Sequence, residues 1–439
     1  MLFIDEVMKK IWEGASKEYE SVYNEALKMD TNELFNIIGD IQMGFYQYPK
    51  VNMSLLATSG CAYHIRNGSL SGCSMCDYHS SAIDGAAVMA ALRQKDTRMY
   101  AKIVRKSFQN IRGDITDQTG NEVITGHDCF SEEEFPEEVY EELLGENGPF
   151  KVRPFRYGFE VRASNVTAEK LNRLKKYTGK GRVMLEMGVE VGNEWVRNNW
   201  INKNVTNNQI VKAVELIHEA GFKVTTDVLL GVPGLTEKQS IEVFVDTIGW
   251  LSAIGVDRYT VLPLNRKKNT IHGFIYRELK NNSRLENIGV AQQEHTGLPW
   301  LFTAIEALCE AIRKIPDFSR RLTLAQYSET QNLVGNELAY NKKLDCECFL
   351  KIFKCMEEFT NTGDVTLITE MGNSMKKDPC YEDYLMLVEK QKNAGDIPET
   401  LNVIGEEIAK VIWPEDWQNK INGFRKELEA FKPVSNITQ

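Results

Sequence analysis

The sequence lacks any long apolar run. Its longest runs, such as residues 228–232 and 300–304, are far shorter than the roughly 20 apolar residues that a membrane-spanning helix needs. The first residues also lack the pattern of a signal peptide, because Asp5 and Glu6 interrupt the apolar positions. No internal repeat or low-complexity segment is present. These absences predict a cytoplasmic globular enzyme without a membrane partner.

An excess of positive charge is absent as well. The formal net charge is −10 and the isoelectric point is near 5.4. Because nucleic-acid binding needs concentrated positive charge, this balance argues against a nucleic-acid substrate. One basic group, between residues 173 and 182, is either a local patch or a solvated helix end. Its members are Arg173, Lys175, Lys176, Lys180 and Arg182.

Cysteine, in contrast, is plentiful. A disulfide framework is not expected among nine cysteines in a chain of this size and compartment. Reduced thiols that cluster in sequence are better explained as metal ligands or catalysts. The nine are Cys61, Cys73, Cys76, Cys129, Cys309, Cys346, Cys348, Cys355 and Cys380.

From residue 51 to about residue 264, short β-rich runs alternate with helical patterns. Several of these runs are apolar on both faces, as buried parallel strands are. Three helices carry a capping-box signature, at residues 131–134, 206–209 and 236–239. The candidate strands are residues 51–58, 122–125, 155–161, 182–189, 223–230 and 258–262.

Six strand–helix units in succession predict an α/β fold with a parallel sheet and helical crossovers. Because the series stops short of eight units, we expect a partial (β/α)6 TIM-type barrel. We assign residues 1–50 to an N-terminal helical segment and residues 51–285 to the barrel. The apolar spacing after residue 285 is mostly helical, so residues 286–439 are expected to form a helical C-terminal extension.

Three cysteines follow the first predicted strand with the spacing C-x11-C-x2-C: Cys61, Cys73 and Cys76. In a parallel barrel the loops after the strands gather at one mouth, where chemistry takes place. Three thiolates there can ligate three irons of a cubane cluster and leave the fourth iron open. The alternative is structural zinc, with His64 or His79 as the fourth ligand. The long gap between Cys61 and Cys73 is unusual for a zinc site and favours the cluster.

This cysteine segment resembles the radical SAM superfamily, in which SAM is S-adenosylmethionine. Within it, the segment resembles the archaeosine synthase-like branch, which also has an extended first gap. Further similarity to that branch runs along the barrel, over residues 51–279. The similar segments are residues 72–78 (GCSMCDY), 125–130 (TGHDCF), 160–162 (EVR), 186–190 (EMGVE) and 201–203 (INK).

The resemblance implies a 4Fe–4S cluster and SAM as cofactors, with Cys61, Cys73 and Cys76 as cluster ligands. SAM would bind the open iron. One electron from the cluster would then cleave SAM to methionine and a 5′-deoxyadenosyl radical, which abstracts hydrogen from the substrate. The cofactor carries the hard chemistry, and the barrel orients the reactants and excludes water. A reductant such as flavodoxin or ferredoxin would supply the electron.

SAM also needs partners for its charged and polar groups. Its ammonium needs acceptors after the second strand, where Gly126, His127 and Asp128 stand in place of the Gly-Gly-Glu of many family members. The remaining assignments are Arg162 for the carboxylate, Glu190 or Glu160 for the ribose, and Met75 and Tyr78 against the adenine. Each has an ordinary alternative: a helix cap for Asp128, a salt bridge for Arg162, and packing for Met75 and Tyr78.

Four more residues are candidates for contact with substrate. Cys129 follows the second strand. It is either a catalytic residue, as a hydrogen-atom donor or a covalent handle, or a buried structural thiol. Asp227, Asn265 and Arg266 are weaker candidates on or after later strands.

Four cysteines of the C-terminal extension invite a second metal site. The spacing of Cys346, Cys348, Cys355 and Cys380 fits neither a usual zinc pair nor a ferredoxin run. An auxiliary cluster, zinc and buried thiols therefore all stay open.

The sequence thus predicts a radical SAM enzyme acting on a small molecule or a modified base, by cleavage or rearrangement. The alternative is a tRNA-modifying radical SAM enzyme similar to archaeosine synthase, with tRNA as a partner. A zinc-binding scaffold is the remaining possibility, and fold alone does not choose the substrate.

Overall fold

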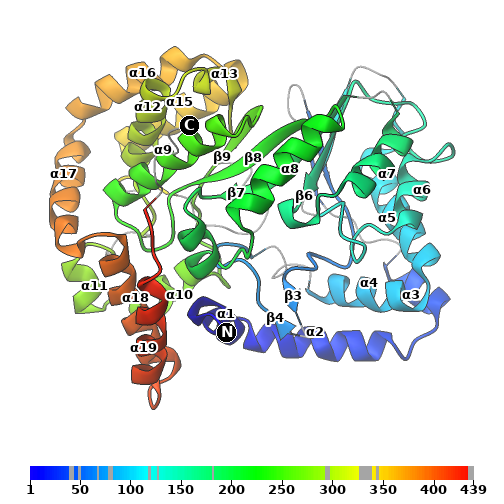
Figure 1. Ribbon diagram of the computed structural model, residues 1–439, viewed down its shortest axis with the longest axis horizontal. Helices are drawn as coiled ribbons and strands as arrows, with labels where there is room; N and C mark the ends of the chain where they lie inside the picture. Colours follow the sequence, from blue (N-terminus) through cyan, green and yellow to red (C-terminus); the bar gives the residue numbers. More distant parts are fainter. Residues whose placement is uncertain are drawn as a thin grey trace.

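A computed structural model describes residues 1–38, 44–47, 51–66, 69–77, 83–116, 120–125, 128–179, 182–291, 297–325, 339–342 and 346–433. Within this part of the chain, one sheet has the strand order β1-β2-β5-β6-β7-β8-β9-β10. β1 is antiparallel to β2, and every later pair is parallel, so seven parallel strands form a half-barrel (Figure 1).

The strands of this sheet are β1 (Phe45–Gln47), β2 (Asn52–Leu55), β5 (Asn121–Thr125), β6 (Arg156–Val161), β7 (Arg182–Glu190), β8 (Lys223–Leu230), β9 (Arg258–Pro263) and β10 (Leu322–Leu324). The six predicted strands are confirmed as β2 and β5 to β9. β1 and β10 were not predicted, because three residues carry too little pattern to signal a strand. β10 pairs with β9 from within the mostly helical C-terminal region.

The helices before β8 are α1 (Phe3–Ile11), α2 (Glu13–Ala26), α3 (Thr31–Ile38), α4 (Ile83–Lys95), α5 (Thr97–Arg112), α6 (Glu137–Leu144), α7 (Ala168–Thr178) and α8 (Asn207–Glu219), with a π-helix at Val196–Trp200 and a 3-10 turn at Ala163–Asn165. The later helices are α9 (Glu237–Ala253), α10 (Ile271–Leu279), α11 (Ser283–Asn287), α12 (Leu301–Lys314), α13 (Phe318–Arg321), α15 (Glu347–Thr362), α16 (Val365–Ser374), α17 (Pro379–Gln391), α18 (Ile397–Ile412) and α19 (Trp417–Leu428), with 3-10 turns at Met375–Lys377 and Lys392–Ala394.

Two of the three predicted capping boxes are confirmed. Thr206 caps α8 and Thr236 caps α9, each with the glutamine three residues later bonded back to the cap. The capping box predicted at Ser131 is wrong, because α6 begins only at Glu137, after Pro136. The freed side chain of Glu134 has another function, described below.

The apolar residues form two buried clusters. The larger lies between the sheet and the helices that cover its outer face, and extends to α12, α15 and α16. The smaller joins α1 to α10, α18 and α19. Figure 1 shows α3 to α7 grouped on one side of the half-barrel and α12, α15, α16 and α17 on the other.

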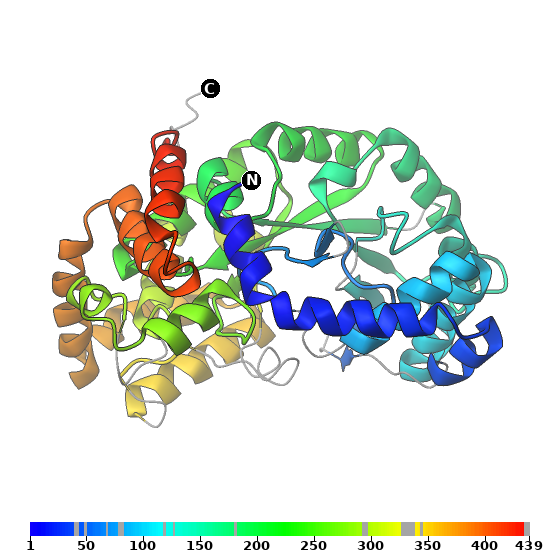
Figure 2. The same cartoon turned by 90° about the horizontal axis from the view of Figure 1, so that it is seen from below.

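The first and last helices lie side by side (Figure 2). The backbone N–H of Phe3 donates to Glu427 at 2.9 Å, and the rings of Phe3 and Phe424 have centroids 4.5 Å apart. α1 and α2 in turn hold the loop that carries the cysteines. The Asp5 carboxylate accepts a hydrogen bond from the Ser71 hydroxyl at 3.0 Å.

None of the helices in the described ranges combines the length and apolar character needed to cross a membrane.

Candidate active site

A cavity of about 1570 Å³ opens at the carboxyl ends of the parallel strands and extends into the half-barrel. Successive side chains of each strand point to opposite faces of the sheet, so every second residue lines this cavity. On β7, Met184, Glu186 and Gly188 line the cavity, whereas Val183 and Leu185 are buried behind the sheet. The volume exceeds the roughly 300–1,000 Å³ of an ordinary ligand pocket, so it can hold a cofactor together with a substrate.

The three predicted cluster ligands all line this cavity. Cys61, Cys73 and Cys76 are each partly exposed. Burial raises the pKa of Cys61, and the Glu134 carboxylate and the other two thiols raise it further. The three sulfurs are more widely spaced than the ligands of a single ion. Among the described residues, the only three potential metal ligands with all their atoms within 4.8 Å of one another lie elsewhere.

Two distant segments fix the cysteine loop. After β7, the Ile201 carbonyl accepts a hydrogen bond from the Ser74 N–H at 2.8 Å, and the Asn202 amide donates to the Gly72 carbonyl at 2.7 Å. After β9, the Ile271 N–H donates to the Ser74 carbonyl at 2.8 Å. The segment at residues 201–203 resembles the archaeosine synthase-like branch in sequence. In the structure, its hydrogen bonds hold the loop around the last two cysteines in place.

The structure gives His64 a packing role. Gly72 has a φ of +94°, and a Cβ there would lie 2.4 Å from Nδ1 of His64. The imidazole is 2% exposed and meets the Trp12 ring edge-on, with ring centroids 4.4 Å apart. Since His64 is not among the described residues that line the cavity, it is not placed to complete a zinc site with the cysteines. His79, the other candidate, lies outside the described residues.

Glu134 was missed as a site residue. Its carboxylate accepts hydrogen bonds from the backbone N–H groups of Ala62 and Asp128, both at 2.8 Å. It thereby joins the residue after Cys61 to the loop after β5. The sequence signal was a glutamate three residues after Ser131, which was interpreted as a helix cap.

Asp128 lines the cavity, but its oxygens already accept hydrogen bonds. The Phe130 N–H donates to Oδ1 at 3.0 Å and the Asn165 amide donates to Oδ2 at 2.5 Å. Burial raises the pKa of Asp128 against the effect of these donors. This arrangement agrees with the capping alternative, and contact with SAM stays a prediction.

Arg162 also lines the cavity, with its guanidinium 3.6 Å from the centre of the Tyr63 ring. It donates to the carbonyls of Lys203 and Asn204 and to the Ser164 hydroxyl. Arg162 is thus fixed at the mouth by the segment after β7, where a carboxylate ligand would meet a positive charge.

Glu190 and Lys203 form a buried ion pair, with Nζ 2.6 Å from Oε1. Burial lowers the pKa of Lys203, but the Glu190 and Cys73 groups outweigh it and the net shift is upward. Oε2 of Glu190 is buried and has no hydrogen-bond partner among the described residues. Glu190 follows a register shift in β7 and has a φ of 69°, a strained conformation for a residue with a side chain. Glu190 is among the residues that line the cavity.

Gly188 makes room for this ion pair. A Cβ at residue 188 would lie 2.4 Å from Nζ of Lys203 and 2.8 Å from Oε1 of Glu190. We expect Gly188→Ala to displace the pair and to weaken SAM binding by about tenfold, the cost of one charged hydrogen bond. Equilibrium binding of SAM measures this. Gly249→Ala is the matched control, since a Cβ there meets nothing within 4 Å, and equal SAM affinity in both variants would contradict the expectation.

Three acids line the interior wall: Glu160, Glu186 and Asp227. Burial raises the pKa of Asp227, and Glu186, Glu160 and Glu190 raise it further. Thr125 donates to Glu160, and Thr260 donates to Glu186 at 2.9 Å. The deep wall is therefore rich in carboxyl groups, which suits a cationic group on a ligand.

Other predicted residues have different positions. Met75 and Asn265 line the cavity. Cys129 is 1% exposed within the larger apolar cluster and is not among the described lining residues, which agrees with a structural thiol. Arg266 is also not among them and lies over the Tyr276 ring at 3.3 Å. The predictions for Tyr78, Gly126 and His127 fall outside the described residues.

Residues 57–258 match the family model described as Radical SAM superfamily. Residues 57–258 therefore form a radical SAM domain, and the chain is an enzyme. Members of this superfamily use a 4Fe–4S cluster and SAM.

Two relatives extend the comparison. An uncharacterized protein of Methanocaldococcus jannaschii is 24% identical over 314 residues, which cover 72% of this chain and 77% of the relative. Archaeosine synthase subunit beta of Thermococcus kodakarensis is 26% identical over 213 residues, 42% of this chain and 61% of that subunit. The second match supports the archaeosine synthase-like branch, although the chain spans less than two thirds of that subunit.

Among solved structures, the chain is similar to the radical S-adenosylmethionine methyltransferase TsrM from Kitasatospora setae, with cobalamin and a 4Fe–4S cluster bound. The identity is 16%, the TM-score is 0.34, and the match covers 52% of this chain and 37% of TsrM. Coproporphyrinogen III oxidase (HemN) from Escherichia coli, a radical SAM enzyme, gives 16% identity, a TM-score of 0.34, and coverage of 54% and 49%.

Proposed function

We propose that this enzyme holds a 4Fe–4S cluster on Cys61, Cys73 and Cys76 and cleaves SAM reductively in the cavity. The observation that carries the proposal is the placement of all three cysteines on the wall of one large cavity at the mouth of the half-barrel. When bound, the cluster and SAM supply a 5′-deoxyadenosyl radical, which abstracts hydrogen from the substrate.

The residues at the mouth fit this cofactor pair. The ligand atoms of these three thiols do not all lie within 4.8 Å of one another, and such a spacing suits separate corners of a cluster. Glu190 keeps one buried carboxylate oxygen without a partner among the described residues, and Arg162 holds a positive charge at the same mouth. An anionic and a cationic group facing one cavity match the hydroxyl, ammonium and carboxylate groups of SAM.

The residues of the interior favour a substrate with a protonated amine. Glu160, Glu186 and Asp227 would bind such a group at the deep wall, below the mouth where the cysteines lie. The half-barrel then orients the substrate and excludes water from the reacting atoms. Cleavage or rearrangement beside the amine is the reaction class that this placement supports.

A second candidate function, tRNA modification, is favoured by the similarity to archaeosine synthase subunit beta. The basic group at the end of α7 does not strengthen it. Two of its five members pair with acids: Arg173 with Glu132 at 2.8 Å, and Lys176 with Glu137 at 3.5 Å. Nucleic acid that co-purifies with the protein, detected by its ultraviolet absorbance, would favour tRNA as the substrate. Absence of nucleic acid would favour a small-molecule substrate.

The direct test uses protein reconstituted anaerobically with iron and sulfide, then reduced with dithionite in the presence of SAM. We expect about four irons per chain and formation of 5′-deoxyadenosine, followed by chromatography. In the variant Cys61→Ala/Cys73→Ala/Cys76→Ala, both the iron and the deoxyadenosine should be lost. A wild-type protein that binds zinc in place of iron and leaves SAM intact would refute the proposal.

A further inference from the structure

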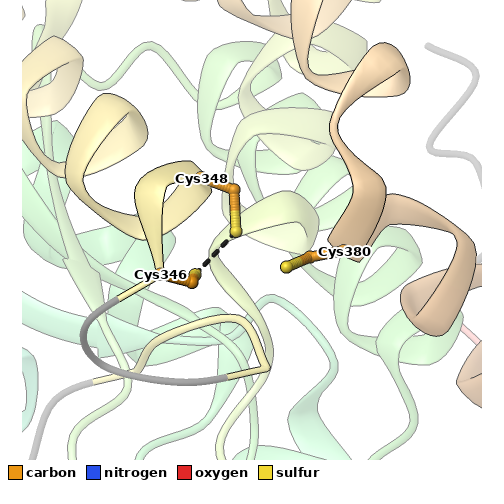
Figure 3. Close-up of side chains that lie close together, drawn as sticks. All are labelled: Cys346, Cys348 and Cys380. Carbon is orange, nitrogen blue, oxygen red and sulfur yellow. Dashed lines mark hydrogen bonds between the residues drawn. The ribbon is translucent and has the colours of Figure 1, made fainter.

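Three cysteines of the C-terminal region converge far from the active-site cysteines. Cys346 is the N-cap of α15, Cys348 lies in its first turn, and Cys380 lies in the first turn of α17. Their sulfurs all lie within 4.8 Å of one another, and those of Cys346 and Cys348 are 2.7 Å apart (Figure 3). All three are free thiols.

Two N–H donors point at these sulfurs. The Phe349 N–H donates to Sγ of Cys346 at 3.2 Å, and the Asn341 amide donates to Sγ of Cys348 at 3.5 Å. The Asn341 side chain is fully buried, and its oxygen accepts from the Phe302 N–H at 3.2 Å, which fixes the NH₂ toward the sulfur. Metal-bound cysteines accept hydrogen bonds of this kind from the residues around them.

Two helix N-termini add positive potential. α15 has 16 residues and α17 has 13, and each presents its cysteines at the end where the helix dipole is positive. Even so, three thiolates held this close repel one another unless a cation lies between them. A metal ion supplies that cation.

We propose that Cys346, Cys348 and Cys380 bind one zinc ion. Zinc–sulfur bonds of about 2.3 Å in a tetrahedral site place sulfurs about 3.8 Å apart, which small rotations of these side chains reach. A cubane cluster attaches each cysteine to a different corner iron and holds the sulfurs farther apart than one ion does. Among the described residues no fourth histidine, cysteine or carboxylate joins these three thiols.

The site has a structural consequence for the cavity. α15 begins at the cysteine group and ends at residues Phe359 to Gly363, which line the active-site cavity. At 1.5 Å per residue, about 20 Å of helix separates the two ends. The zinc ion would tie the start of α15 to α17 and thereby fix the helix whose far end forms the cavity wall.

The test measures zinc and iron by mass spectrometry in the whole protein, purified anaerobically without added zinc. We expect one zinc per chain in the wild type, and loss of at least tenfold in Cys348→Ser and in Cys380→Ser. Cys355→Ser is the matched control, because Cys355 lies on α15 but its thiol donates to the Leu367 carbonyl at 3.3 Å. The variant without Cys61, Cys73 and Cys76 should lose its iron and keep its zinc.

A cobalt titration of that last variant gives a second readout that does not depend on the folding of the serine variants. Tetrahedral thiolate-bound Co²⁺ should produce intense visible bands and saturate at one equivalent. Three results would each overturn the proposal. The first is loss of zinc in the variant without Cys61, Cys73 and Cys76, and the second is iron beyond four per chain that disappears in Cys380→Ser. The third is a disulfide between Cys346 and Cys348 in the anaerobic protein.

Discussion

Glu190→Gln is expected to raise the dissociation constant of SAM by about 10- to 100-fold while the protein keeps its iron. The carboxylate has one oxygen paired with Lys203 and a second, buried oxygen without a partner among the described residues. A hydrogen bond to a charged group contributes about 1.5–3 kcal/mol, which corresponds to this range of affinity. The amide keeps the size of the side chain and one acceptor but loses the charge.

Equilibrium binding of SAM to the reconstituted protein checks this result, together with the rate of deoxyadenosine formation. Glu132→Gln is the matched control, because Glu132 lines the same cavity but is 56% exposed at its rim. If Glu190→Gln bound SAM as tightly as the control, the carboxylate would serve only to neutralise Lys203. A decrease in thermal stability without a change in affinity would lead to the same conclusion.

Glu237→Gln is expected to make the free energy of unfolding much less dependent on pH. Glu237 is buried in the first turn of α9, where it accepts hydrogen bonds from the Trp300 N–H and the Thr303 hydroxyl. Burial, opposed by these donors, raises its pKa to about 8. As the pH rises, the unfolded chain loses this proton near pH 4.5 and the folded protein only near pH 8. Wild-type stability therefore falls across this window.

A shift of one pKa unit corresponds to about 1.4 kcal/mol. Between about pH 5.5 and pH 8, the free energy of unfolding of the wild type should therefore fall by roughly 3 kcal/mol more than that of Glu237→Gln. Urea denaturation at the two pH values measures this difference. Glu242→Gln removes a charge from the same helix at a position that is 57% exposed, and it should behave like the wild type. If the free energy of unfolding changed with pH in the same way in all three proteins, the pKa of Glu237 would be the same in the folded and the unfolded chain.

The sequence allowed the six main strands to be predicted because parallel strands are bounded by capped helices. Thr206 and Thr236 each mark a helix start, and the preceding strand end is then constrained within a few residues. β10 could not be found in this way. Leu322 to Leu324 join the sheet only because tertiary packing returns the chain to β9.

Residues of the candidate site could be predicted where they lie close to one another in the sequence. Cys61, Cys73 and Cys76 share one loop, so their spacing alone indicated a metal site. Glu134 and Lys203 act through partners distant in sequence, and no local pattern reveals such pairs. The C-terminal cysteines show the same limit, because only the packing of α17 against the start of α15 brings Cys380 to Cys348.

The contact between the first and last helices has a consequence for how the enzyme is made. On the ribosome, α1 is synthesised long before α19, yet Phe3 is buried against Phe424 and bonded to Glu427. Until α19 emerges, the support that α1 gives to the cysteine loop through Asp5 and Ser71 is itself unsecured. We therefore expect the cluster-binding loop to reach its final form only after synthesis has passed the last helix, so that iron–sulfur delivery is a late, post-translational event.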